Sequence, residues 1–205
     1  MGTSLTLVLA KQIIPMSRKY KFQNPTAAYF ISFATVNWID VFTRQAYFSI
    51  LEESITHCRA EKGMEVFAYC FMPSHVHLVF RSDHEDPSGL LRDFKGYTSR
   101  KMIKAITENQ QESRREWLLW MFERAGKKNS NVTKMQFWQQ HNKPIELWSG
   151  KVIKQKIDYI HNNPVVQGFV TDPVHWKYSS ARNYADDETI LKIDNEGMHL
   201  GMMEL

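Results

Sequence analysis

The sequence has few of the features that mark secreted, disulfide-linked or membrane-spanning proteins. Only two cysteines, Cys58 and Cys70, occur in 205 residues, and both have apolar neighbours. This number excludes a disulfide framework and a cysteine-based zinc site, and it predicts reduced thiols in the core. No apolar run approaches the roughly 20 residues that cross a bilayer, and the apolar segment 5–10 is too short for a signal peptide. We therefore expect a cytoplasmic protein with no membrane partner.

Internal repeats, low-complexity runs and linkers are absent as well, and the remaining composition is that of a folded domain. Hydrophobic residues make up 43% of the chain and aromatic residues 13%, which is enough for a sizeable core. We expect one domain over residues 16–186, preceded by an extension of unassigned role at 1–15 and followed by a tail at 187–205. The net charge of +4 favours an anionic partner.

Residues 64–80 predict two apolar strands joined by a tight turn at 72–74. His75 and His77 lie two positions apart in the second strand, so both imidazoles project from the same face. The alternating residues point to the opposite face and predict a core contact: Val76, Leu78 and Phe80. Neutral imidazole ligates several divalent metals, so the pair indicates half of a metal site. An ordinary pair of surface histidines is the alternative.

The other segments predict an α+β protein with a ferredoxin-like core, in which an antiparallel sheet carries helices on one face. A further helix near the C-terminus completes the expected order. The predicted segments are a strand at 28–36, helices at 44–62, 86–106, within 107–130 and at 151–163, and a short hairpin of 135–139 with 145–148. Both main helices would cover one face of the sheet, and the histidines should then lie on the free face.

Two of these helices raise the question of a partner. The helix that begins near residue 86 carries several positive charges: Arg92, Lys95, Arg100, Lys101 and Lys104. A solvated helix face explains them most simply, and a phosphate-contacting surface is the alternative if the ligand is nucleic acid. The apolar residues at 117–122 predict a helix side that packs either on the core of this chain or on a second copy, so a homodimer stays open.

The helix at 151–163 places Tyr159 and Asn163 four positions apart, one turn from each other on one face. Such a helix could direct a phenol and an amide oxygen to the same point. Together with His75 and His77, Asn163 could be a third metal ligand and Tyr159 a nucleophile. The simpler explanations are a packing tyrosine and an asparagine that ends the helix before Pro164.

Three stretches together resemble the REP-associated tyrosine transposases, which belong to the single-tyrosine HUH transposases that act on single-stranded DNA. They are CFMPSHVHLVF, DYIHNNPVVQGFV and WKYSSARNY. The similarity extends from about residue 17 to residue 184 and includes RDFKGYTSRK and ESRREW. Ser74 stands where the family more often has asparagine. The extension at 1–15 and the tail after 186 have no counterpart.

The resemblance implies a catalytic domain in which His75 and His77 bind Mg²⁺ or Mn²⁺ and Asn163 is the third ligand. It implies that Tyr159 attacks a phosphate of single-stranded, hairpin-forming DNA, which leaves a 5′-phosphotyrosine bond and a free 3′-hydroxyl that allow rejoining. Two other functions stay open. One is a non-catalytic protein that binds single-stranded nucleic acid on its sheet. The other is a metal hydrolase that uses the histidines with a carboxylate and needs no tyrosine.

Overall fold

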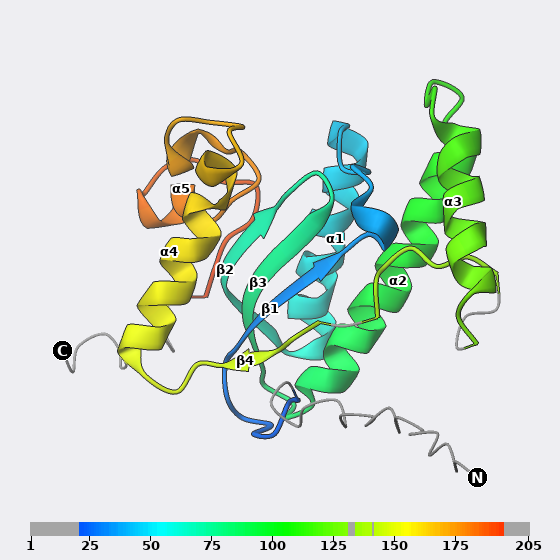
Figure 1. Cartoon of the computed structure of the whole chain (residues 1–205). Helices are drawn as coiled ribbons and strands as arrows, with labels where there is room; N and C mark the ends of the chain where they lie inside the picture. The colour runs from blue at the N-terminus through cyan, green and yellow to red at the C-terminus, as the bar shows by residue number, and fades with distance from the viewer. Residues whose placement is uncertain (1–20, 131–133, 141, 195–205) are drawn as a thin grey trace, which may run out of the picture.

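The protein contains a four-stranded antiparallel sheet with helices on both faces (Figure 1). The structure is a computed structural model that describes residues 21–130, 134–140 and 142–194, so the extension at 1–15 lies outside the described residues. The strands are β1 (Tyr29–Ala34), β2 (Met64–Phe71), β3 (His75–Ser82) and β4 (Ile145–Glu146). The helices are α1 (Gln45–Lys62), α2 (Pro87–Glu108), α3 (Arg115–Lys127), α4 (Gly150–Val166) and α5 (Ala181–Tyr184), with short 3-10 turns η1 (Val36–Trp38) and η2 (Pro173–His175).

The strand order is β2-β3-β1-β4, and all neighbouring strands are antiparallel. β1 and β2 are joined through α1, and β3 lies between them in the sheet. β3 and β4 are joined through α2 and α3, and β1 lies between them. This is the interleaved order of a ferredoxin-like core, so the predicted fold class is confirmed.

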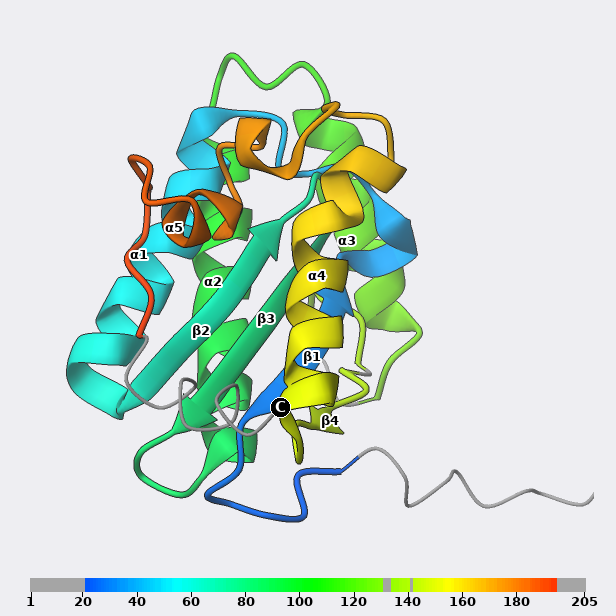
Figure 2. The same ribbon diagram turned by 90° about the vertical axis from the view of Figure 1, so that its left-hand side faces the viewer.

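The helices form two layers, one on each face of the sheet. Helices α1 and α2 pack on one face, and α3 packs against α2 (Figure 1). Helix α4 packs on the opposite face, in front of β3 and β1 in Figure 2. The expectation that this second face is free is therefore wrong. The apolar residues of α4 explain the difference, because an amphipathic helix of this length must bury one side.

Two separate apolar cores result from this arrangement. The larger lies between the sheet and α1, α2 and α3, and it contains Val76, Leu78 and Phe80 from β3. The smaller lies between the sheet and α4. It includes Phe30, Val79, Ile153, Ile157 and Ile160. Because side chains alternate along β3, the histidines share the second face with Val79. The histidines thus lie where α4 meets the sheet.

Local signals place the helix starts as predicted. The carboxylate of Asp86 accepts a hydrogen bond from the backbone N–H of Gly89 at 2.7 Å, and it begins α2. The hydroxyl of Ser149 accepts one from Val152 at 3.4 Å and begins α4. Gly63 ends α1 with a φ of 62°, which glycine adopts without strain.

The sequence predicts that the helix ends before Pro164. In the structure α4 continues through Pro164 to Val166. A proline inside a helix removes one backbone hydrogen bond and disfavours helical geometry at the preceding residue. Here Pro164 and Asn163 are both buried against the sheet side, and the packing of this turn outweighs the local preference. Asn163 therefore stays on the helix, in line with Tyr159.

The predicted hairpin of 135–139 with 145–148 is also wrong. Both segments run along the same edge of β1 and do not pair with each other. Trp138 forms a bridge with Thr35, and Gln139 donates its N–H to the carbonyl of Ala34 at 2.8 Å. Strand β4 pairs with Tyr29 and Phe30. The open edge of β1 offers backbone hydrogen bonds to both segments in turn.

Two further segments complete the described fold. Helix α3 runs from Arg115 through Gly126 to Lys127, inside the range 107–130 where a helix is expected. The C-terminal segment is described as far as residue 194, where the Asp194 carboxylate accepts a hydrogen bond from Val66 at 2.9 Å and pairs with Arg59. None of the helices in the described part of the chain is long and apolar enough to cross a membrane.

Candidate active site

The two histidines lie side by side on the central strand β3, with small residues across from them. His77 is opposite Ser32 of β1 and Cys70 of β2, and His75 is opposite Ala34. Because these side chains are short, they leave room for the imidazoles on this face of the sheet. The two ring centroids are 4.7 Å apart, and the exposed fractions are 4% for His75 and 2% for His77. Both rings are on one face, as the strand alternation predicts.

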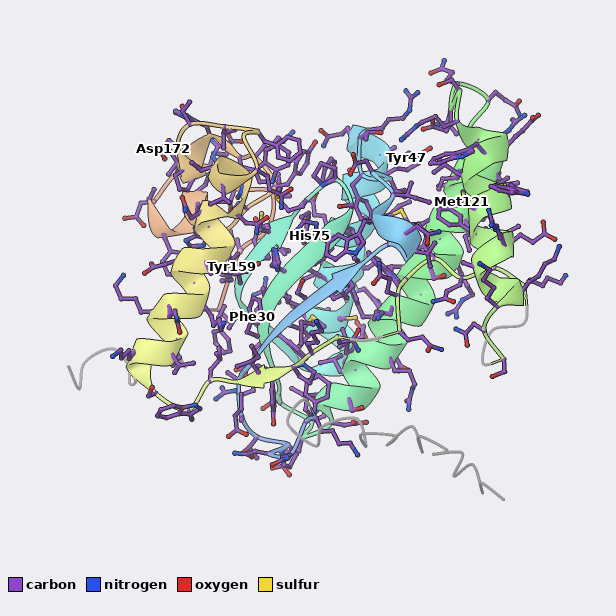
Figure 3. The ribbon with its side chains drawn as sticks, in the orientation of Figure 1. Phe30, Tyr47, His75, Met121, Tyr159 and Asp172 are labelled. Carbon is purple, nitrogen blue, oxygen red and sulfur yellow. The ribbon has the colours of Figure 1, made fainter. Side chains whose placement is uncertain are left out.

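Tyr159 reaches the histidines from α4. Its ring centroid lies 5.2 Å from that of His77 and 5.8 Å from that of Phe30, edge-on to both rings. Figure 3 shows Tyr159 between α4 and the sheet, on the side of His75 and Phe30. The side chain keeps 48% of its surface exposed, so the phenol is open to a large substrate. Asn163 follows one turn later and is buried.

The surroundings keep both imidazoles in their neutral form. Burial lowers the pKa of His75, and it lowers the pKa of His77 to about 3, with a further contribution from the neighbouring His75. The side chain of Asn163 opposes the shift of both pKa values, although it meets neither nitrogen of His77 at hydrogen-bond geometry. A neutral imidazole keeps the lone pair that a metal ion requires.

The polar atoms of the site fit a divalent cation. Both ring nitrogens of His77 are buried without a hydrogen-bond partner among the described residues, which is rare for buried polar atoms. Nδ1 of His75 lies 3.2 Å from the hydroxyl oxygen of Ser74. The amide of Gln167 donates to Oδ1 of Asn163 at 2.8 Å and fixes that oxygen. Nitrogen and oxygen donors of this kind suit Mn²⁺ and, less well, Mg²⁺.

A carboxylate ligand is missing from this group. Across the ranges that the structure describes, no cluster of three or more His, Cys, Asp or Glu side chains could hold a metal ion. Among the described residues, a third protein ligand would therefore have to come from another residue type. Asn163 has the appropriate oxygen, and its role as a ligand stays a prediction.

Sequence reasoning missed a cation beside the phenol. The Nζ of Lys156 lies 5.9 Å from the ring centroid of Tyr159 and 5.1 Å from that of Phe30. Lys156 has no carboxylate partner among the described residues, whereas Lys154 pairs with Asp158 at 2.7 Å. The spacing of three positions to Tyr159 on a helix could have indicated this neighbour.

A second missed residue is Trp38 in η1. Its ring centroid lies 5.3 Å from that of His75, and 56% of its surface is exposed. Asn37 and Trp38 both have a positive φ, 55° and 56°, which is unusual for a residue with a bulky side chain. Nothing in the sequence places this tryptophan near the histidines, because its position depends on the turn after β1.

The five basic residues predicted to bind DNA lie on α2, in the helix layer on the other side of the sheet. The structure does not bring them together with the histidines. Lys95 is largely buried and donates to the carbonyl oxygen of Gln139 at 2.8 Å and to Oδ1 of Asn142. Burial lowers its pKa to about 8. Arg92 and Lys104 pair with Asp93 and Glu108.

Comparisons with known proteins agree with the resemblance found in the sequence. The family model described as "Transposase IS200 like" matches residues 26–122, a segment that contains both histidines and ends before α4. A solved structure of a REP-associated tyrosine transposase bound to a REP hairpin superposes with a TM-score of 0.59 at 16% identity. That superposition covers 87% of this chain and 93% of the other. The predicted resemblance to this group is confirmed.

Other comparisons add less. The crystal structure of a putative transposase from Deinococcus radiodurans R1 is 19% identical, with a TM-score of 0.40, over 71% of this chain and 95% of that one. No curated protein matches the chain. The likeness to the hairpin-bound structure supports the fold, and the family match over residues 26–122 supports a DNA-cleaving type of enzyme.

Proposed function

We propose that this chain, whose residues 26–122 match the model of the IS200-like transposase family, cuts and rejoins single-stranded DNA through a covalent bond to Tyr159. The observation that carries the proposal is the half-exposed phenol of Tyr159, held beside two buried, neutral imidazoles. The similar structure described above holds a REP hairpin, and this supports a hairpin-forming single strand as the substrate.

The reaction conserves the number of phosphodiester bonds. The phenol of Tyr159 loses its proton, and its oxygen forms a bond to a DNA phosphorus. The bond from that phosphorus to the 3′ oxygen breaks, and the 3′ oxygen takes up a proton and leaves as a hydroxyl. The product is a 5′-phosphotyrosine bond, and attack by a 3′-hydroxyl reverses the step without ATP. A phenol is a poor nucleophile at neutral pH, so the site must lower the barrier.

Three residues of the chain would hold the metal ion: His75, His77 and Asn163. When bound, a divalent cation such as Mg²⁺ or Mn²⁺ neutralises phosphate charge and polarises the phosphorus–oxygen bonds. The chain's own residues add to this. Lys156 places a positive charge beside the phenol, where the phosphate of the substrate would lie. Gln167 keeps the oxygen of Asn163 fixed by its hydrogen bond.

The basic residues of α2 have a different part in the proposal. Arg100 and Lys101 have no carboxylate partner in the described part of the chain, and they would contact DNA phosphates at a distance from Tyr159, with Arg92 and Lys104 beside them. Lys95 supports the fold through its hydrogen bonds to Gln139 and Asn142. Replacing Arg100 and Lys101 with alanine should weaken DNA binding across sequences.

The test is covalent capture. The full chain is incubated with a fluorescein-labelled single-stranded hairpin DNA and Mn²⁺, and the products are separated on a denaturing gel. Wild-type protein and Tyr97→Phe should form a labelled adduct, and Tyr159→Phe should form none. Tyr97 is a matched control because its side chain is also exposed, at 38% against 48% for Tyr159. The substitution removes one oxygen and little packing area.

Other results would point elsewhere. An adduct that survives in Tyr159→Phe and disappears in Tyr97→Phe would place the nucleophile on α2. Binding of the hairpin without any adduct, with Mg²⁺ and with Mn²⁺, would favour a non-catalytic nucleic-acid-binding protein. DNA hydrolysis that persists in Tyr159→Phe would favour a metal hydrolase.

A further inference from the structure

A groove of about 930 Å³ opens at Trp38, and neither His75 nor His77 is among its lining residues. Its lining residues come from η1, from α3 and the residues just after it, and from the segment 136–140. Helix α3 packs against η1. The lining of the groove includes Trp38, Arg124, Lys128, Gln136 and Gln140. The groove therefore combines one aromatic ring with cations and amides, the side-chain types that bind single-stranded nucleic acid.

Trp38 joins the groove to the candidate active site. Its ring lies 5.3 Å from His75, His75 lies 4.7 Å from His77, and His77 lies 5.2 Å from Tyr159, all measured between ring centroids. Each pair meets edge-on, so the rings form a continuous row from Tyr159 to Trp38. A strand whose phosphate lies at Tyr159 and whose chain follows this row would bring its next nucleotides into the groove.

The backbone of η1 holds the tryptophan in an exposed position. Oγ1 of Thr35 lies 2.7 Å from the carbonyl oxygen of Ile39 and 3.1 Å from that of Ser74, so it ties the two ends of the turn to the loop before β3. The left-handed conformation of Asn37 and Trp38 is kept against the usual preference of such residues. The turn presents the indole to solvent, where a base could stack on it.

The cations at the groove are not neutralised by acidic residues. Arg124 lies over the ring of Trp120 at 5.2 Å, and neither Arg124 nor Lys128 has a carboxylate partner in the described part of the chain. The adjacent Lys127 differs, because it pairs with Glu123 at 2.7 Å and does not line this groove. Unpaired cations beside an aromatic ring favour a phosphate backbone as the ligand.

The amides form an ordered chain of hydrogen bonds along the wall. Gln140 donates to Asn129 at 2.8 Å, Asn129 donates to Gln136 at 2.9 Å, and Gln136 donates to the carbonyl oxygen of Trp138 at 2.9 Å. The chain fixes the orientation of each amide before any ligand arrives. Amide groups held in this way can form hydrogen bonds with base edges.

We propose that this groove is a second DNA subsite, which holds the unpaired nucleotides next to the phosphate at Tyr159. Trp38 stacks on one base, and Arg124 and Lys128 hold the adjacent backbone. The proposal rests on the proposed function in one respect, that single-stranded DNA is the ligand. It adds the path that the strand follows beyond the reacting phosphate.

The test measures binding and not cleavage. The parent protein is the full chain with Tyr159→Phe, which lacks the proposed nucleophile and so forms no covalent adduct during the measurement. Fluorescence anisotropy compares a labelled DNA hairpin without an extension against the same hairpin with a short oligothymidine extension on its 5′ or 3′ side. The extension on one side should raise the affinity. Trp38→Ala should reduce that gain about tenfold, as expected for the loss of one stacked base. Trp38→Phe should keep most of it.

A second pair of variants tests the cations. Arg124→Gln with Lys128→Gln should remove the gain and lower the salt dependence of binding by about 1.4 in the logarithmic slope, at about 0.7 for each cation on a single strand. Lys127→Gln is the control and should bind the extended hairpin as the parent does. Thermal unfolding of each variant shows whether the fold is kept.

Several outcomes would overturn the subsite. The groove is not a DNA subsite if neither extension raises the affinity, or if the gain survives both Trp38→Ala and the double glutamine variant. Displacement of the extended hairpin by an acidic peptide more readily than by oligothymidine would assign the groove to a protein partner. Failure of the proposed chemistry can be told apart from failure of the subsite. In that case the wild-type protein, which keeps Tyr159, forms no adduct, but the extension still raises the affinity for the hairpin.

Discussion

The ring of Tyr159 lies edge-on to the imidazole of His77, with 5.2 Å between centroids and 77° between ring planes. The two residues come from elements far apart in the sequence, the helix α4 and the central strand β3. Their contact depends on how α4 packs on the sheet through the smaller core. The proposed nucleophile and metal ligand are therefore positioned by tertiary packing, and substitutions can separate chemistry from stability.

His77→Leu should stabilise the protein while it removes metal binding. Both ring nitrogens of His77 are buried without a partner in the described part of the chain, and an apolar side chain of similar size would relieve that unfavourable burial. We expect a gain of about 1 kcal/mol in the free energy of unfolding, measured by urea denaturation. Calorimetry should detect no Mn²⁺ binding. A clear loss of stability would show that His77 has a structural role.

Lys156→Gln should slow adduct formation about tenfold or more, because it removes a positive charge 5.9 Å from the ring centroid of Tyr159. The measurement is the rate of covalent capture at saturating DNA. Lys154→Gln is the matched control on the same helix, since Lys154 is paired with Asp158 and does not reach Tyr159. Equal rates for the two variants would remove Lys156 from the proposed site.

Glu112→Gln should destabilise the protein by about 2–3 kcal/mol at neutral pH. Burial alone would raise the pKa of Glu112, but hydrogen bonds from Arg44 and Arg114 outweigh it and lower the pKa below its usual 4.5. A lowered pKa in the folded state adds stability above pH 4.5 that is lost as the pH falls through the folded-state value.

The pH dependence of stability is the control for the Glu112→Gln prediction. The difference in unfolding free energy between wild type and Glu112→Gln should be largest above pH 4.5 and should shrink in more acidic solution, as measured by denaturation at a series of pH values. A difference that stays constant with pH would mean that the ion pairs of Glu112 contribute little.

Two helix glycines should respond in opposite directions to alanine. A Cβ at Gly96 in α2 would meet only Nη1 of Arg100 at 3.5 Å, so Gly96→Ala should stabilise by about 0.5–1 kcal/mol through its higher helix propensity. A Cβ at Gly126 in α3 would collide with the backbone carbonyl of Lys134. Gly126→Ala should therefore lower the melting temperature, and a rise would contradict this packing.

Much of the fold follows from local patterns in the sequence. The alternation from His75 to Phe80 predicts which face of β3 enters the larger core, and the helices expected to start at residues 86 and 151 begin within one residue of those positions. The four-residue spacing of Tyr159 and Asn163 predicts their common helix face. These signals are local, because each depends on residues within one strand or one helical turn.

The rest depends on contacts between segments distant in the sequence. Pro164 predicts a helix end, yet α4 continues to Val166, with Asn163 and Pro164 both buried. The charge of Lys95 suggests a surface residue. In the structure Lys95 is largely buried and donates a hydrogen bond to the carbonyl oxygen of Gln139, 44 positions along the chain. The position of Trp38 beside His75 follows from a turn whose conformation the sequence does not reveal.

The division of the interior into two apolar cores makes partial opening of the native state possible. Helix α4 belongs to the smaller core, so it can detach in a cooperative unit while the sheet and the helices behind it stay folded. Such an opening takes Tyr159, Lys156 and Asn163 away from the histidines together. Loss of the proposed adduct formation on heating should then precede global unfolding, and amide protons of α4 should exchange with solvent before those of β3.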